Sequence, residues 1–126
     1  MTSLGRHFLI EYHGCNPDTL DNVDLVRDIM VFAANESGAT ILNIYLHKFS
    51  PQGVSGVIVI AESHIAIHTW PEHGYAAVDI FTCGSNVDPW VAYKIMKDKL
   101  GSSESSTKEI TRGTLPKARL KNAAQG

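Results

Sequence analysis

The stretch VIVIAESHIAIHTWPEHGYAAVDIFTC, residues 57–83, holds the strongest structural signal in this chain. Residues 57–61 are all apolar, which is typical of a short buried strand. Residues 65–70 continue as extended chain, and the sequence Pro-Glu-His-Gly at 71–74 is typical of a turn. Residues 75–83 then have the composition of a further strand. We therefore expect these segments to be consecutive strands of one sheet.

Outward from this stretch, two helices are predicted. Each begins with a capping side chain followed by a proline at the first helical position, at Asn16-Pro17 and at Asp88-Pro89. Apolar residues then recur at helical spacing, and Gly38 and Gly101 stand where helices commonly end. The sequence therefore predicts one amphipathic helix between Pro17 and Gly38, and a second between Pro89 and Gly101.

Further strands are predicted at 7–12, at 40–49 and, as an edge strand, at 108–112. The order β, α, β, β, a further strand, α, β predicts an α+β fold. We expect a mainly antiparallel sheet with two helices on one face, in a ferredoxin-like or split βαβ plan. Residues 1–113 are interpreted as a single domain, and the small, polar and basic residues 114–126 as a flexible tail.

The composition is ordinary for a globular protein, with 126 residues, 44% of them hydrophobic, and a net charge of −2. This charge offers no general attraction for nucleic acid or for a membrane surface, so neither is expected as a partner. Arg6 and His7 interrupt the only early apolar run, and no apolar stretch has the length of a membrane helix. Cys15 and Cys83 do not make a disulfide scaffold. We therefore predict a soluble, cytoplasmic protein, with Cys15 in a structural role.

A dense polar cluster follows the apolar strand. Residues 62–72 include two histidines, two glutamates, a serine and a threonine, and burying such groups is costly unless they are paired or functional. His64 and His68 stand four residues apart, so a zinc site with His73 or Cys83 deserves consideration. The local pattern is extended, however, and the usual spacing of paired ligands is absent. We therefore predict no metal here.

Several short motifs occur together in this region at matched spacing. They are SGV, ESH, IHTWPE, GYAA and D-x-FTCG, at residues 55–57, 62–64, 67–72, 74–77 and 79–84. Together they resemble the signature of the bacterial and archaeal class of S-adenosylmethionine decarboxylase, a pyruvoyl-dependent lyase. Residues 3–7 and 20–22 are similar to the same family, and the resemblance covers about residues 3–100. It implies conversion of S-adenosylmethionine to the decarboxylated aminopropyl donor used in spermidine and polyamine biosynthesis, with release of CO2.

The resemblance implies that the chain makes its own cofactor by autocatalytic cleavage of a zymogen. The hydroxyl of Ser63 would attack the carbonyl of Glu62 and turn the peptide bond into an ester. Loss of the Cα proton and hydrolysis of the dehydroalanine would then leave a pyruvoyl group derived from Ser63. The products would be a β chain, 1–62, and an α chain, 63–126. His68 resembles the family's proton acceptor in this processing.

Other roles are implied by the same resemblance. Ser55 is similar to the processing helper that hydrogen-bonds the reacting carbonyl, and Cys83 to the proton donor of catalysis. The pyruvoyl carbonyl would form a Schiff base with the substrate, which is the task of pyridoxal phosphate elsewhere, so no pyridoxal phosphate is expected. Glu72 is implied in holding the ribose hydroxyls, and Phe49 in stacking on adenine from a neighbouring subunit. Trp70 either lines the pocket or packs. A homodimer of cleaved protomers is therefore expected.

Two other functions stay open at this stage. A pyruvoyl-dependent arginine or ornithine decarboxylase on the same scaffold would keep Ser63, His68 and Cys83, but would need no nucleoside pocket. The presence of Glu72 and Phe49 favours the nucleoside substrate. An uncut, non-catalytic regulatory paralogue would be expected to lack one of the three catalytic residues, and all three are present.

Overall fold

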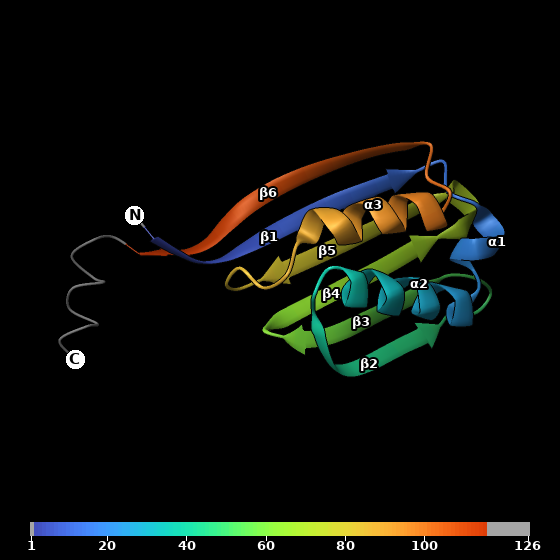
Figure 1. The fold of residues 1–126 in the computed structure, drawn as a ribbon. Coiled ribbons are helices and arrows are strands. Elements are labelled where there is room, and N and C mark those ends of the chain that lie inside the picture. Colours follow the sequence, from blue (N-terminus) through green and yellow to red (C-terminus); the bar gives the residue numbers. More distant parts are fainter. Residues whose placement is uncertain (1, 116–126) are drawn as a thin grey trace.

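Residues 2–115 are described by the computed structural model of the chain, and they form one six-stranded sheet with two main helices (Figure 1). The strands are β1 (Thr2–His13), β2 (Thr40–Lys48), β3 (Val54–Ala61), β4 (Ser63–Trp70), β5 (Tyr75–Thr82) and β6 (Glu104–Leu115). The helices are the short α1 (Pro17–Leu20), α2 (Val23–Glu36) and α3 (Pro89–Lys99), and a 3-10 turn, η1 (Pro71–His73), joins β4 to β5. Most of the tail predicted at 114–126 lies outside the described residues.

All neighbouring strands are antiparallel, in the order β2-β3-β4-β5-β1-β6. β1 and β2 therefore run parallel with three strands between them, and α1 and α2 lie on the connection that joins them. β5 and β6 are likewise parallel, on either side of β1, and are joined through α3. Each connection is a split βαβ unit, so the predicted α+β plan is confirmed.

The core lies between one face of the sheet and the helices α2 and α3 (Figure 1). Burial alternates along β5, because successive side chains of a strand point to opposite faces. The largest fully buried side chains come from strands and helices alike: Phe8, Tyr12, Leu20, Met30, Ile58, Ile65, Ile67, Met96 and Leu100. Within residues 2–115 no helix covers the other face of the sheet (Figure 1). No helix of this part of the chain is long and apolar enough to cross a membrane.

The segment after Pro17 contains two helices, so the prediction of one continuous helix to Gly38 was wrong. α1 ends after a single turn at Leu20. The side chain of Asn22 then accepts a hydrogen bond from the backbone N–H of Leu25, at 3.0 Å, and begins α2. A second capping residue inside the apolar pattern therefore restarts the helix, although the hydrophobic periodicity continues through the break.

The last strand is longer than the predicted 108–112. β6 pairs with β1 along almost the whole length of both strands, from Thr2 opposite Leu115 to His13 opposite Glu104. It therefore includes residues 114 and 115, which were predicted to belong to the tail. All of its residues are exposed or half-buried, and such an edge strand lacks the apolar alternation from which strands are predicted.

Thr69, on β4, links α1 to β3 and β4. Its hydroxyl accepts a hydrogen bond from the backbone N–H of Val54 at 2.9 Å, and donates one to the carbonyl of Leu20 at 2.8 Å. The side chain is buried, so water cannot readily replace either partner. This residue holds α1 at the end of the sheet where β4 meets η1.

Replacing Thr69 with valine keeps the shape of the side chain but removes both hydrogen bonds. We expect Thr69→Val to lower the free energy of unfolding by about 1–3 kcal/mol, because two buried backbone groups lose a partner. Urea denaturation followed by circular dichroism measures this change. Thr107→Val is the matched control, since the hydroxyl of Thr107 is buried without a partner among residues 2–115. Equal destabilisation by the two substitutions would contradict the assigned role.

Candidate active site

The Glu62-Ser63 bond lies at the tip of the hairpin that joins β3 to β4. Ser63 pairs with Ile60, so that only Ala61 and Glu62 form the connection. The backbone of Ser63 has a φ angle of 145°, and no other residue apart from glycine has a positive φ among residues 2–115. Such values are uncommon for residues with a side chain and are found at functional sites. The bond predicted to be cut is therefore held in a strained turn.

Cys83 lies at the same end of the sheet as this turn. It follows the last residue of β5, Thr82, which pairs with Ser63 across the β4–β5 ladder. Glu62 and Cys83 both line a cavity of about 210 Å³, and the thiol of Cys83 is free and half-buried. The structure thus brings together the predicted cleavage site and the predicted proton donor.

Ser55 and His68 form a second group, at the other end of β3 and β4. The two residues are cross-strand partners, and the Ser55 hydroxyl lies 2.8 Å from Nδ1 of His68. They line one cavity of about 320 Å³ together with the three predicted substrate contacts, which are Phe49, Trp70 and Glu72. The aromatic ring of Trp70 is stacked on Tyr75, with 5.2 Å between the ring centroids. The predicted base and the predicted substrate pocket are therefore adjacent in the structure.

Within one chain, the group around Ser63 and the group around His68 lie far apart. Ser63 and His68 are five residues apart on β4, which corresponds to about 17 Å along an extended strand. An odd separation also directs the two side chains to opposite faces of the sheet. Ile65 and Ile67, which share a face with Ser63, are buried under the helices, whereas His68 is exposed on the uncovered face. The side chains of Ser63 and His68 therefore do not meet within a single protomer.

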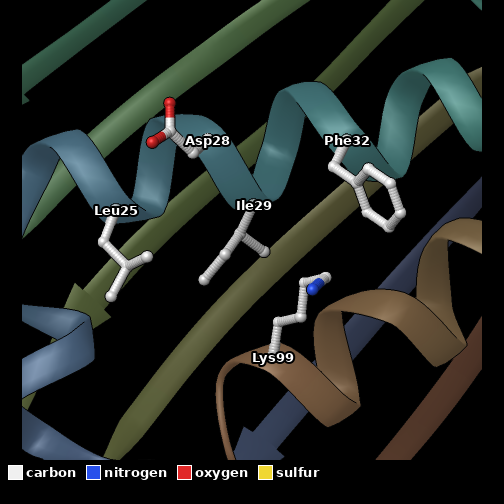
Figure 2. A pocket seen from close by; sticks show the side chains of 5 residues that line it. All are labelled: Leu25, Asp28, Ile29, Phe32 and Lys99. Atoms are coloured by element: carbon white, nitrogen blue, oxygen red, sulfur yellow. The ribbon is translucent and has the colours of Figure 1, made fainter.

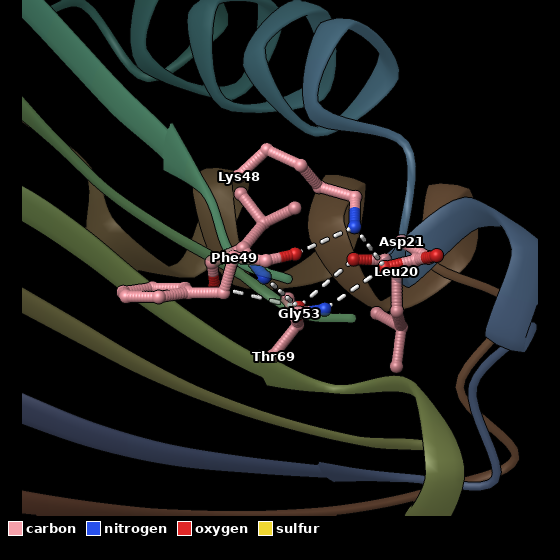
Figure 3. A network of polar contacts seen from close by, with 7 residues as sticks. Leu20, Asp21, Lys48, Phe49, Gly53 and Thr69 are labelled. Atoms are coloured by element: carbon pink, nitrogen blue, oxygen red, sulfur yellow. Dashed lines mark hydrogen bonds and ion pairs between the residues drawn. The ribbon is translucent and has the colours of Figure 1, made fainter. Parts of the chain in front are cut away.

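A polar network holds the turn that carries Phe49 (Figure 3). Oδ1 of Asp21 accepts a hydrogen bond from the backbone N–H of Gly53 at 2.8 Å, and lies 2.9 Å from Nζ of Lys48. Lys48 also donates to the carbonyl of Phe49 at 2.9 Å, and the N–H of Phe49 donates to the carbonyl of Gly53 at 2.8 Å. The hydrogen bond from Gly53 and the contact with Lys48 lower the pKa of Asp21. Sequence reasoning did not find this network, because its members are distant in the chain.

A row of rings crosses the uncovered face near the Ser63 end of the sheet. His64 on β4 stacks against Phe81 on β5, with centroids 5.9 Å apart, and His7 on β1 meets Phe81 edge-on at 5.4 Å. Burial lowers the pKa of His7, an effect that Asp79 opposes and Arg112 reinforces. His7 was not identified as a site residue from the sequence, because only the fold places it beside β5.

Two other features bear on the choice of site. Within residues 2–115 no group of three or more histidine, cysteine, aspartate or glutamate side chains is arranged to hold a metal ion. A larger cavity, of about 480 Å³, lies between α2 and α3 (Figure 2). Leu25, Phe32 and Lys99 line it, and it contains none of the predicted site residues. The candidate site is therefore the two groups at the ends of β4.

Comparison with known proteins places the chain in a class of decarboxylase proenzymes. It is 52% identical to the S-adenosylmethionine decarboxylase proenzyme of Pelotomaculum thermopropionicum, over 98% of each chain, and 55% identical to that of Carboxydothermus hydrogenoformans, over 91% of each. The crystal structure of the adenosylmethionine decarboxylase from Aquifex aeolicus is similar, with a TM-score of 0.86, 32% identity, and coverage of 93% of this chain and 97% of that one. The model of the S-adenosylmethionine decarboxylase family matches residues 6–113, and the chain belongs to this family.

The network around Asp21 makes a testable contribution to stability. Its folded-state pKa is lowered, so the contribution is present above the usual carboxyl pKa and is lost as the pH falls through the lowered value. We expect Asp21→Asn to lower the melting temperature at pH 7, and the difference from the unmodified chain to shrink as the pH falls from 7 to below the usual carboxyl pKa. Thermal melts over this pH range measure it. Asp28→Asn is the control, since Asp28 is exposed and forms an ion pair with its neighbour Arg27. A difference that does not depend on pH would contradict the role of the charge.

Proposed function

We propose that this chain cuts itself between Glu62 and Ser63, and that the cut protein decarboxylates S-adenosylmethionine to the aminopropyl donor for polyamine synthesis. The observation that carries the proposal is the strained Glu62-Ser63 turn with Cys83 on the same cavity, in a member of this family. A strained peptide at an exposed hairpin tip is suited to attack by its own side chain, because the turn already departs from relaxed extended geometry.

The residues at the hairpin fit the formation of a pyruvoyl group. The Ser63 hydroxyl bonds to the carbonyl carbon of Glu62, the C–N bond breaks, and an ester replaces the peptide bond. A base takes the Cα proton of Ser63, the Cβ–Oγ bond breaks, and Glu62 departs as a carboxylate. Water then converts the dehydroalanine into the pyruvoyl group with release of ammonia. This group supplies the carbonyl that holds the amine of the substrate and takes up the electrons released with CO2.

The separation of Ser63 and His68 calls for a second copy of the chain. The uncovered face of the sheet carries exposed aromatic side chains, among them Tyr45 and Trp70, and is suited to packing against a like surface. A two-fold axis between two such faces, running across the strands, reverses β4 of one copy relative to the other. The His68 end of one chain then faces the Ser63 end of its partner. We therefore propose a homodimer with two composite sites, in which the partner's His68 approaches the backbone of Ser63, and so its Cα proton, from the uncovered face, while the Ser63 side chain lies on the covered face.

Each remaining residue has a proposed role, supported by the Ser55–His68 contact and by the shared cavity. Ser55 occupies Nδ1 of His68 and so orients the ring, leaving Nε2 to accept the Cα proton during processing. Cys83 donates a proton to the product carbon. The carboxylate of Glu72 binds the ribose hydroxyls, and Phe49 stacks on the adenine with Trp70 lining the same cavity. Neither a metal nor pyridoxal phosphate enters this scheme.

The cavity favours a nucleoside over a plain amino acid as substrate. Arginine and ornithine offer no flat ring for Phe49 and Trp70 and no neighbouring hydroxyls for Glu72, whereas S-adenosylmethionine offers both. An uncut regulatory protein would need neither the strained turn at Ser63 nor the nearby thiol of Cys83. The decarboxylase is therefore the function that uses all of the residues in both groups.

Removing the Ser63 hydroxyl tests the cleavage directly. We expect the unmodified chain to give fragments 1–62 and 63–126, the second with a pyruvoyl mass in place of serine, and Ser63→Ala to stay intact. Intact-mass spectrometry of the denatured protein distinguishes these species. Ser85→Ala is the control, because Ser85 is an exposed serine two residues beyond Cys83. Cleavage of the Ser63→Ala chain before residue 63 would overturn the mechanism.

Mixing two inactive variants tests the composite site. Ser63→Ala lacks the nucleophile and His68→Ala lacks the base, so each alone is expected to stay uncut. When the two are refolded together, the His68→Ala chain is expected to be cut, because its Ser63 meets the intact His68 of the partner copy. Mass spectrometry shows which chain is cleaved. No cleavage in the mixture, under conditions where the unmodified chain refolds and is cut, would contradict a site shared between two copies.

Glu72→Gln tests the nucleoside contact. The substitution turns a charge-assisted hydrogen bond to the ribose into a neutral one, so we expect KM for S-adenosylmethionine to rise about tenfold with kcat little changed. Release of CO2 from carboxyl-labelled substrate measures both constants, and Glu36→Gln, at the exposed end of α2, is the control. An unchanged KM, or release of CO2 from arginine or ornithine instead, would count against the assigned substrate.

A further inference from the structure

Thr82 carries a buried hydroxyl without a partner. Three polar residues are buried among residues 2–115, and two of them are hydrogen-bonded: Ser37 donates to the carbonyl of Ala34 at 2.8 Å, and Thr69 holds Leu20 and Val54. Thr82 is only 2% exposed, and its Oγ1 has no hydrogen-bond partner among the described residues. Buried hydroxyls in native proteins are nearly always paired, so Thr82, the one of these three buried residues without a partner, needs an explanation.

The position of Thr82 beside Ser63 explains why its hydroxyl has no partner. It is the cross-strand partner of Ser63 in the β4–β5 ladder. By strand alternation Thr82 shares a face with Ile80, and Ser63 shares the same face with Ile65. The Cβ atoms of directly opposed residues are about 4.5–5.5 Å apart, so a rotation about the side-chain bonds brings two hydroxyls within hydrogen-bond distance. No hydrogen bond joins them in the uncut chain described here.

We propose that the Thr82 hydroxyl donates a hydrogen bond to Oγ of Ser63 during self-cleavage, and that it assists the elimination step above all. This inference rests on the proposed function. In the elimination a base takes the Cα proton, a double bond forms between Cα and Cβ, and the Cβ–Oγ bond breaks. The electron pair of that bond stays on Oγ, which departs as part of the new carboxylate of Glu62. Negative charge therefore develops on the oxygen toward which Thr82 can point.

The missing partner in the resting chain is what such a role requires. A hydrogen bond accelerates a step only if it is stronger in the transition state than in the starting state. A buried donor that is already desolvated, and that finds its acceptor only when charge develops, meets this condition. A hydroxyl that was already paired, as that of Thr69 is, would have to break one hydrogen bond before making the other.

The test compares three substitutions in the full-length chain. Thr82→Val removes the hydroxyl and keeps the shape, Thr82→Ser restores a hydroxyl, and Thr107→Val removes another buried, unpartnered hydroxyl far from the turn. The cleavage rate is followed by intact-mass spectrometry, and samples are treated with hydroxylamine, which cleaves the ester between Ser63 and Glu62. We expect cleavage to slow about tenfold or more in Thr82→Val, with accumulation of ester. Thr82→Ser and Thr107→Val are expected to cut close to the unmodified rate.

The other possible outcomes would contradict either this inference or the proposed function. Equal cleavage rates in Thr82→Val and the unmodified chain would overturn the inference and leave the proposed function intact. Slow cleavage without accumulation of ester would remove the assigned elimination step. Loss of folding in Thr82→Val would show that the hydroxyl is engaged in the resting protein, and so would overturn the premise. An unmodified chain that never cuts would overturn the proposed function itself.

Discussion

β4 lies between β3 and β5, and its pairing register decides which residues meet at the candidate site. The register sets Ser55 opposite His68 and Thr82 opposite Ser63. A slip of one residue would turn Ile65 and Ile67 toward solvent and carry His68 into the core, so burial of the apolar side chains strongly favours the observed pairing. The hydrogen bonds of Thr69 hold the end of the strand in the same register.

The one-sided packing of the helices has a functional consequence. α2 and α3 cover one face of the sheet, and the other face carries the proposed substrate pocket, the row of rings around Phe81, and the Ser55–His68 pair. A strand of eight residues is too long for groups at its two ends to react with each other. The proposed dimer accounts for both the uncovered face and the length of β4. It covers the free face of each sheet and brings the opposite ends of the two β4 strands together. The polar network at Asp21 then holds Phe49 at the rim of that face.

Much of the fold followed from local chemistry. Both helix starts at a capping residue before proline are confirmed, because a cap and its helix interact within a few residues. The strands β3, β4 and β5 were predicted from apolar runs and turn residues. The break at Asn22 and the length of β6 were missed for different reasons. Asn22 interrupts an apolar pattern that continues on both sides, and β6 is held by its partner β1 rather than by a pattern of its own.

The sequence by itself determined the family and the α+β plan. It also predicted Glu62-Ser63 as the bond to be cut, because the atoms of a peptide bond and its following side chain are neighbours in any fold. It named Ser55 and His68 for processing and Phe49 and Glu72 for substrate binding without relating the two pairs in space, and the structure places all four on one cavity. Only the tertiary structure decided that Ser63 and His68 lie at opposite ends of β4, that Thr82 faces Ser63, and that Asp21 reaches Lys48 and Gly53. These relations join residues from different strands and helices, and their distances depend on strand register and sheet order, which no local pattern in the sequence specifies.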